Sequence, residues 1–185
     1  MLCPVGWMKW MLAVLLFLLL GCAAPDDQNQ QEVSIVKLTS PVFSNNSAIP
    51  GMYTCDGQNI SPPLLIADAP PAAKSLALLM DDPDVPKSIR ADGMWDHWVV
   101  FNIPPATTSI PEGKSPPGVK GKNTSGKLAY AGPCPPDKEH RYFFKLYALD
   151  STLALREGTS KAEVERAMEG HILAKAELMG RYKRR

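Results

Sequence analysis

The apolar positions of the chain fall into short runs of strand length, separated by segments rich in turn residues. Residues 75–80, Ser-Leu-Ala-Leu-Leu-Met, are continuously apolar after the serine, which is typical of a strand buried on both faces. Residues 141–150 alternate most clearly, with Tyr142 and Phe144 among the side chains of one face. Residues 33–38 form a shorter β-prone run. This pattern predicts a mainly β domain.

A further strand is predicted over residues 97–103, which are rich in β-branched and aromatic types. Strict alternation along it places His97, Val99 and Phe101 on one face, and Trp98, Val100 and Asn102 on the other. By the same rule His140, one residue before the strand at 141–150, is expected on the same side as Tyr142.

Helical signals occur only near the C-terminus. Residues 160–163, Ser-Lys-Ala-Glu, have the spacing of a capping box, and Gly170 is a suitable stop. Residues 172–179 are interpreted as a second helical segment that ends at Gly180. Between strands and helices, residues 104–126 hold nine Pro or Gly and predict a long loop. We therefore expect strands with one or two short C-terminal helices.

The N-terminus has the pattern of an export signal. Lys9 precedes ten apolar residues, 11–20, which are too few to span a bilayer as a helix. The segment Leu-Leu-Gly-Cys that ends at Cys22 resembles the bacterial lipoprotein cleavage box, in which the cysteine becomes the lipidated N-terminus. An ordinary secretory signal cut elsewhere, or an uncleaved anchor, is the alternative.

This interpretation divides the chain into a signal peptide (1–21), a polar flexible tether (22–32) and one domain (33–185). It predicts a bacterial envelope protein anchored to a membrane through acyl chains such as palmitate. Because Ala23, rather than Asp, follows the lipidated cysteine, we expect the outer membrane in a host that has one.

Charge and cysteine content narrow the function further. The chain has 20 Lys and Arg against 19 Asp and Glu, and loss of residues 1–21 removes only Lys9, so the mature domain is neutral. A neutral domain argues against nucleic acid as a partner. Of four cysteines, only Cys55 and Cys134 remain beyond the signal and the lipidation site, and in an exported protein they are expected to form a disulfide.

Candidate chemistry gathers at strand ends. Pro83 and Pro86 stiffen the loop that carries Asp82, and His97 starts the strand that follows it. With His140 and Tyr142, these side chains offer several hydrogen-bond donors, which suits a phosphate or carboxylate. An anion favours protonated imidazoles, so affinity is expected to rise as pH falls. Asp82 has two possible roles, either to orient a histidine or to receive a cationic part of the ligand.

Several motifs in order are similar to the phosphatidylethanolamine-binding protein family, in its bacterial and archaeal Raf kinase inhibitor-like branch. They are Asp-Pro-Asp-Val-Pro (82–86), Trp-Asp-His-Trp (95–98), Gly-Pro-Cys-Pro-Pro (132–136), His-Arg-Tyr (140–142), and the segments 53–57 and 59–64. The resemblance covers about residues 33–179 and implies a β-sandwich-like fold with a small anion pocket. On the matching positions, the pocket residues would be Asp82, Pro86, Trp95, His97, Gly132, His140 and Tyr142.

Two departures from the family pattern bear on this pocket. Eukaryotic members often have His-His where this chain has Asp96-His97, which predicts an extra acid beside the pocket. The C-terminal helix that borders the pocket in eukaryotic members is not closely matched, so it contributes no site residue.

The leading functional hypothesis is a lipid-anchored binding module for a phospho-ligand, without enzymatic activity or cofactor. The ligand would be phosphate, a phospholipid headgroup or another phosphorylated molecule. A regulator of a protein partner is the alternative, because family members inhibit kinases or a peptidase. A metal-dependent hydrolase is a third possibility: the chain lacks the G-x-S-x-G and H-E-x-x-H motifs, but His97, His140, Cys134 and Asp82 are a conceivable zinc set.

Overall fold

The computed structural model describes residues 35–184, and the signal, lipidation site and tether expected at residues 1–32 lie outside that range. Among the described residues, none of the helices has the length and apolar character needed to cross a bilayer. The described residues belong to a single unit of the chain, residues 33–185.

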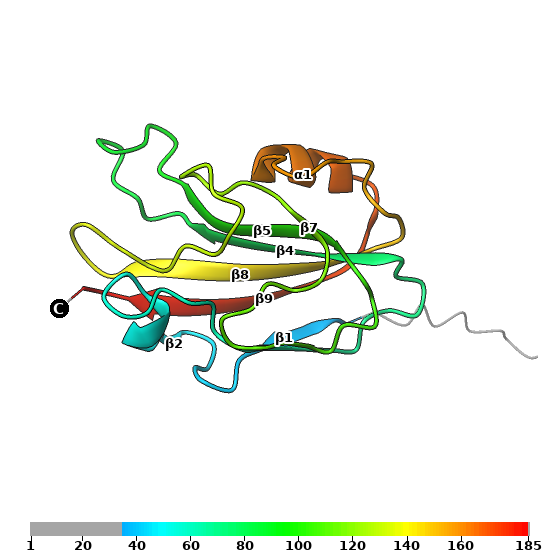
Figure 1. The fold of residues 1–185 in the computed structure, drawn as a ribbon, viewed down its shortest axis with the longest axis horizontal. Coiled ribbons are helices and arrows are strands. Elements are labelled where there is room, and N and C mark those ends of the chain that lie inside the picture. Colours follow the sequence, from blue (N-terminus) through cyan, green and yellow to red (C-terminus); the bar gives the residue numbers. More distant parts are fainter. Residues whose placement is uncertain (1–34, 185) are drawn as a thin grey trace, which may run out of the picture. The chain divides into compact units, whose positions relative to one another are not determined.

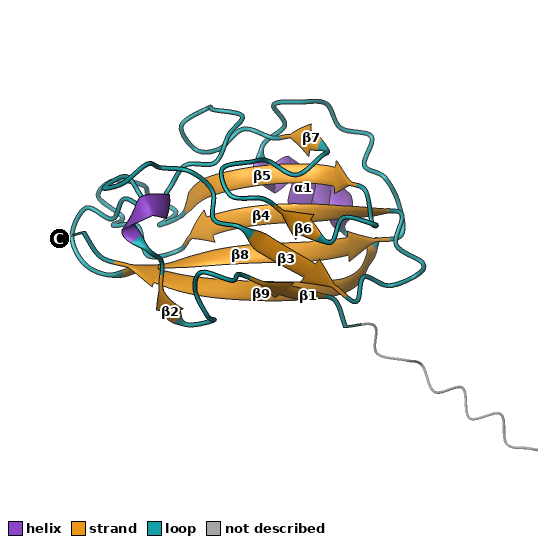
Figure 2. Cartoon of the chain, turned by 60° about the horizontal axis from the view of Figure 1, so that its bottom comes forward, coloured by secondary structure: helices purple, strands orange, loops and turns teal. Residues whose placement is uncertain are grey.

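A six-stranded sheet and a three-stranded sheet form the fold (Figures 1 and 2). The large sheet has the order β2-β9-β8-β4-β5-β7, and its strands are β2 (Ser47–Ala48), β4 (Ser75–Asp82), β5 (Trp95–Ile103), β7 (Val119–Lys120), β8 (His140–Leu149) and β9 (Ile172–Tyr182). The small sheet has the order β1-β3-β6, with β1 (Lys37–Thr39), β3 (Leu64–Ala67) and β6 (Ser109–Ile110). The helices are the 3-10 turn η1 (Gly51–Tyr53) and α1 (Lys161–Met168).

The large sheet is covered on both faces. One apolar cluster fills the space between the two sheets, and a second lies under α1, which packs on the opposite face (Figure 1). β4 lies at the centre and is buried along its whole length, as its unbroken apolar run predicts. The expected mainly β, sandwich-like architecture is confirmed.

The prediction of a helix over residues 172–179 is wrong. These residues form most of β9, which pairs antiparallel with β8 from Ile172 to Tyr182. Their composition favours a helix, but burial alternates along much of the segment, with Leu178, Gly180 and Tyr182 buried at successive second positions. Pairing with a long central strand therefore outweighs local helix propensity.

The other helical prediction is confirmed. The Ser160 hydroxyl accepts from the backbone N–H of Glu163, and the Glu163 carboxylate accepts from the Ser160 N–H, which is the reciprocal geometry of a capping box. Gly170 adopts a φ of 78°, in the left-handed region that glycine occupies without strain. Helix α1 thus begins and ends where the sequence indicates.

A β-bulge at His97 changes which face of β5 this histidine occupies. Met80 of β4 pairs with Trp98, but the next residue, Asp81, pairs with Asp96, so His97 is an extra residue in β5. Val99 packs beneath α1 as strict alternation requires, whereas His97 turns to the opposite side of the sheet and contacts Tyr142. The expectation that His97 shares a face with Val99 is therefore wrong.

Candidate functional site

A cavity of about 400 Å³ lies where three strands of the large sheet meet. β4 runs antiparallel to both β5 and β8, so its last residue, Asp82, lies beside the first residues of both neighbours. Five side chains or backbone positions proposed from the sequence line this cavity: Asp82, Trp95, His97, Gly132 and His140.

Two other residues of the expected set do not line it. Tyr142 is fully buried behind the two imidazoles, with ring centroids 5.3 Å from His97 and 6.5 Å from His140. Burial, followed by the neighbouring Asp82 carboxylate, raises the pKa of the Tyr142 phenol, so the ring stays neutral. Pro86 lies outside the lining, to which its loop contributes Val85 and Ile89.

His140 is held between two carboxylates. Its Nδ1 is 2.7 Å from Asp82 Oδ2 and its Nε2 is 2.9 Å from Asp137 Oδ1. Both ring nitrogens therefore donate, which requires a charged imidazolium. Burial alone would lower the pKa of His140, but hydrogen bonds to Asp82 and then Asp137 outweigh it and raise the pKa.

The same hydrogen bonds show the role of Asp82. One carboxylate oxygen accepts from His140 and the other accepts from the backbone N–H of Asp84 at 2.8 Å. Asp82 thus orients His140, the first of the two roles considered from the sequence. His140, in turn, has no ring N–H left for a guest, contrary to the expectation that both imidazoles offer donors.

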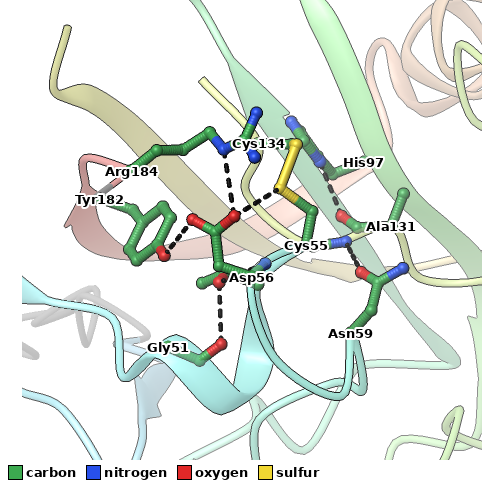
Figure 3. Close-up of a disulfide and its surroundings, with 11 residues drawn as sticks. Gly51, Cys55, Asp56, Asn59, His97, Ala131, Cys134, Tyr182 and Arg184 are labelled. Atoms are coloured by element: carbon green, nitrogen blue, oxygen red, sulfur yellow. Dashed lines mark hydrogen bonds and ion pairs between the residues drawn. A yellow bond between two sulfur atoms is a disulfide. The ribbon is translucent and has the colours of Figure 1, made fainter. Parts of the chain in front are cut away.

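His97, unlike His140, has a neutral imidazole ring. Its Nδ1 lies 2.6 Å from the carbonyl oxygen of Ala131, so Nδ1 carries the hydrogen and donates it (Figure 3). Desolvation by burial lowers the pKa of His97, although the Ala131 carbonyl and the charge of Asp82 oppose this effect. A neutral ring follows, and its Nε2 keeps a lone pair.

Two loops, residues 53–59 and 125–136, close the cavity and are joined by a disulfide. Cys55 and Cys134 are bonded, as predicted, with Cα atoms 5.4 Å apart (Figure 3). Both residues line the cavity. Asn59, in the left-handed region at φ 56°, accepts from the Gly132 N–H at 2.7 Å. A Cβ on Gly132 would lie 2.5 Å from Tyr53 O and 2.6 Å from Asn59 Oδ1, so only glycine fits there.

The extra acid beside the histidine does not face the cavity. The Asp96 carboxylate points to the other face of the sheet and lies 3.3 Å from the Lys161 ammonium of α1. The proposed zinc set also fails, because the Cys134 sulfur is used in the disulfide. Within residues 35–184, no group of three His, Cys, Asp or Glu side chains is placed to hold a metal ion.

Several lining residues were not identified from the sequence. Asn59, Lys127 and Tyr130 supply an amide, an ammonium and an aromatic ring, and Tyr130 donates from its hydroxyl to Tyr53 O at 2.8 Å. A partial signal was present, because Asn59 opens the Asn-Ile-Ser-Pro-Pro-Leu motif. Lys127 and Tyr130 lie in an irregular segment without a recognisable pattern.

Comparison with known proteins relates this chain to one protein family. A family model described as phosphatidylethanolamine-binding protein matches residues 39–183. The chain is 52% identical over 149 residues to a UPF0098 protein of Chlamydia pneumoniae, covering 80% of this chain and 99% of that protein. A UPF0098 protein of Methanothermobacter thermautotrophicus is also 52% identical, over 155 residues, with the same coverage.

Solved structures agree with this result. A crystal structure described as a putative phosphatidylethanolamine-binding protein homolog from Chlamydia trachomatis superposes with a TM-score of 0.80 at 49% identity, covering 82% of this chain and 99% of that one. YbcL of E. coli, described as a new member of the mammalian PEBP family, gives 0.73 at 31% identity, covering 81% and 99%. None of these names indicates an enzymatic activity.

Proposed function

The chain belongs to the phosphatidylethanolamine-binding protein family, and on that premise we propose that it binds a small phospho-ligand in the cavity between His97 and His140. The observation that carries the proposal is the cavity itself. Five residues expected from the family motifs, and drawn from four separate segments, line one cavity of about 400 Å³. That volume lies within the range of small-molecule sites.

The lining supports a phosphoryl group more than an apolar guest. Lys127 supplies a positive charge, and the Asn59 amide and Trp95 indole supply N–H groups. The aromatic rings of Trp95 and Tyr130 provide apolar wall for the rest of a small molecule. Asp82 acts here as a positioning residue for His140, because both of its oxygens are already used.

Calorimetric titration of the purified protein with inorganic phosphate and with phosphoethanolamine tests the proposal. We expect saturable binding at millimolar ligand or below, and at least tenfold weaker binding by Trp95→Ala, which removes an N–H and one wall. Lys175→Met is the matched control, because Lys175 is exposed on β9 and does not line the cavity. Absence of heat with both ligands in the folded wild type would reject the proposal.

We also propose that Cys22 carries a lipid anchor that holds the domain at the bacterial envelope. The support is the sequence alone: one basic residue, ten apolar residues and Leu-Leu-Gly-Cys. Growth with labelled palmitate should label the wild type, and Cys22→Ser should remove both the label and retention in the membrane fraction. Label that persists in Cys22→Ser would contradict this assignment.

A further inference from the structure

Only some of the polar atoms that line the cavity remain free to bind a guest, because the others already form hydrogen bonds within the protein. The Asp82 oxygens, both His140 nitrogens, the Gly132 N–H and the Tyr130 hydroxyl all have protein partners. Among the lining side chains, which all lie within the described part of the chain, five polar atoms make no hydrogen bond within the protein. They are Asn59 Nδ2, Trp95 Nε1, Ser125 Oγ, Lys127 Nζ and His97 Nε2.

His97 Nε2 differs from the other four atoms because it can only accept. Its partner nitrogen, Nδ1, is fixed as the donor by the Ala131 carbonyl at 2.6 Å, so the neutral ring has its lone pair on Nε2. The residue keeps only 4% of its accessible surface, and it lines the cavity without Nε2 being fully enclosed, so this atom retains contact with the open cavity. A guest must offer it a hydrogen or leave it unsatisfied.

The charges around the cavity bear on the net charge of the guest. Asp82 and Asp137 contribute two negative charges, and His140 and Lys127 contribute two positive charges. These four charges sum to zero, and the Asp81 and Asp96 carboxylates near His97 are paired with Lys145 and Lys161. No net positive charge is therefore present to hold a doubly charged guest in preference to a singly charged one. A deprotonated phosphate monoester carries about two.

From these contacts we propose that the site selects a singly charged, protonated phosphate monoester, whose P–OH donates to His97 Nε2 while its other oxygens accept from Asn59, Trp95 and Lys127. This inference rests on the proposed function and adds to it the protonation state and ester class of the ligand. A phosphate diester and a sulfate ester have the same charge but no such hydrogen, so the site should discriminate against both.

Four small ligands test the inference on the full-length protein, three of them nearly the same size. Methyl phosphate, methyl sulfate and dimethyl phosphate are all monoanions at pH 5, and only the first has a hydroxyl hydrogen, because its second pKa is about 6. We expect methyl phosphate to bind at least about tenfold tighter than the other two at pH 5, as for a hydrogen bond that cannot be replaced. Its affinity should fall on going to pH 8, as the ligand loses its hydrogen.

Each alternative gives a different result. Equal binding of methyl phosphate and methyl sulfate at pH 5, with both weakening toward pH 8, would mean a charged His97 and would overturn the inference while leaving anion binding intact. Tighter methyl phosphate binding at pH 8 would also overturn it. The fourth ligand, glycerophosphoethanolamine, offers an ammonium hydrogen instead, and binding as tight as methyl phosphate would reject the monoester assignment. No binding of any ligand would reject the proposed function itself.

Two variants test which residue causes the preference for methyl phosphate over methyl sulfate. Lys127→Met, an exposed position at the rim, should weaken methyl phosphate and methyl sulfate by similar factors and leave their ratio unchanged. His97→Phe should bring the ratio at pH 5 close to one, because the acceptor is lost. Where His97→Phe does not fold, the wild-type ratio of the two ligands still decides the matter.

Discussion

At the scale of single residues, the two cavity histidines show how burial and carboxylate partners together decide protonation. His97 and His140 each begin a strand-like run, and each has an acidic residue nearby in the sequence, Asp96 and Asp137 respectively. His140 meets two carboxylates and is charged, whereas His97 meets a carbonyl oxygen in a buried position and is neutral. The cavity therefore contains one imidazolium, fully engaged, and one imidazole with a free lone pair.

We expect the ring signals of these histidines to titrate on opposite sides of the ordinary histidine pKa of about 6.5. Burial keeps the pKa of His97 below that value, and the Asp82 and Asp137 hydrogen bonds keep the pKa of His140 above it despite burial. NMR titration of histidine-labelled protein, assigned with Asp137→Asn, measures both. Asp137→Asn should lower the pKa of His140 and leave that of His97 nearly unchanged; two coincident titrations would contradict this.

The shifted pKa values of the two histidines make the stability of the fold depend on pH, in opposite directions. For His140 the folded pKa exceeds the unfolded one, so its pairing stabilises the fold fully below about pH 6.5 and this contribution is lost as pH rises through the folded value. For His97 the folded pKa is the lower one, so stability falls as pH drops from about 6.5 toward that value.

Sequence reasoning identified His97 as a site residue but placed it on the wrong face, because alternation cannot reveal a bulge. The bulge depends on how β5 pairs with β4, at Met80 and Asp81, and that pairing is not encoded in the residues next to His97. Asp82 and Gly132 were easier to identify, since prolines and glycines mark rigid loops in the sequence itself. Asn59 and Lys127 required the folded loops.

At the scale of elements, α1 is attached to the sheet by a buried charge cluster as well as by apolar packing. The Lys161 ammonium lies 2.9 Å from the Asp81 carboxylate, which is fully buried, and Lys145 reaches the same carboxylate at 2.8 Å. Burial alone would lower the pKa of Lys161, but Asp81 outweighs this effect and raises it. Sequence reasoning located the helix from its cap but gave no sign of this cluster.

Replacing Lys161 by Met should therefore destabilise the domain by about 3 kcal/mol, the lower end of the cost of breaking a buried pair, because Lys145 remains beside Asp81. Urea unfolding monitored by tryptophan fluorescence measures the change as a shift of midpoint. The matched control is Lys175→Met, an exposed lysine on β9, which should change the free energy of unfolding by less than about 0.5 kcal/mol. Equal midpoints for the two variants would show that the cluster contributes nothing net.

At the scale of the whole molecule, topology brings the site together. Residues far apart in sequence meet because a central strand ends where its two antiparallel neighbours begin, and the loops from 53–59 and 125–136 then cover that end (Figures 1 and 3). The disulfide was predictable from export and cysteine count, whereas the β9 strand was not, since its partner β8 rather than its own composition determines its structure.

The disulfide links the covering loops across a sequence separation of 79 residues, so its reduction should act on stability and on the cavity together. Chain-entropy arguments give about 4.5 kcal/mol for a closed loop of this length. Because both cysteines line the cavity, the cover loosens as well, and we expect phosphate affinity to fall several-fold in dithiothreitol. The double variant Cys55→Ala, Cys134→Ala should show the reduced behaviour with or without reductant. Unchanged unfolding and unchanged affinity in the reduced wild type would mean that the hydrogen bonds between the loops, Asn59–Gly132, Tyr130–Tyr53 and Cys55–Pro133, hold them without the disulfide.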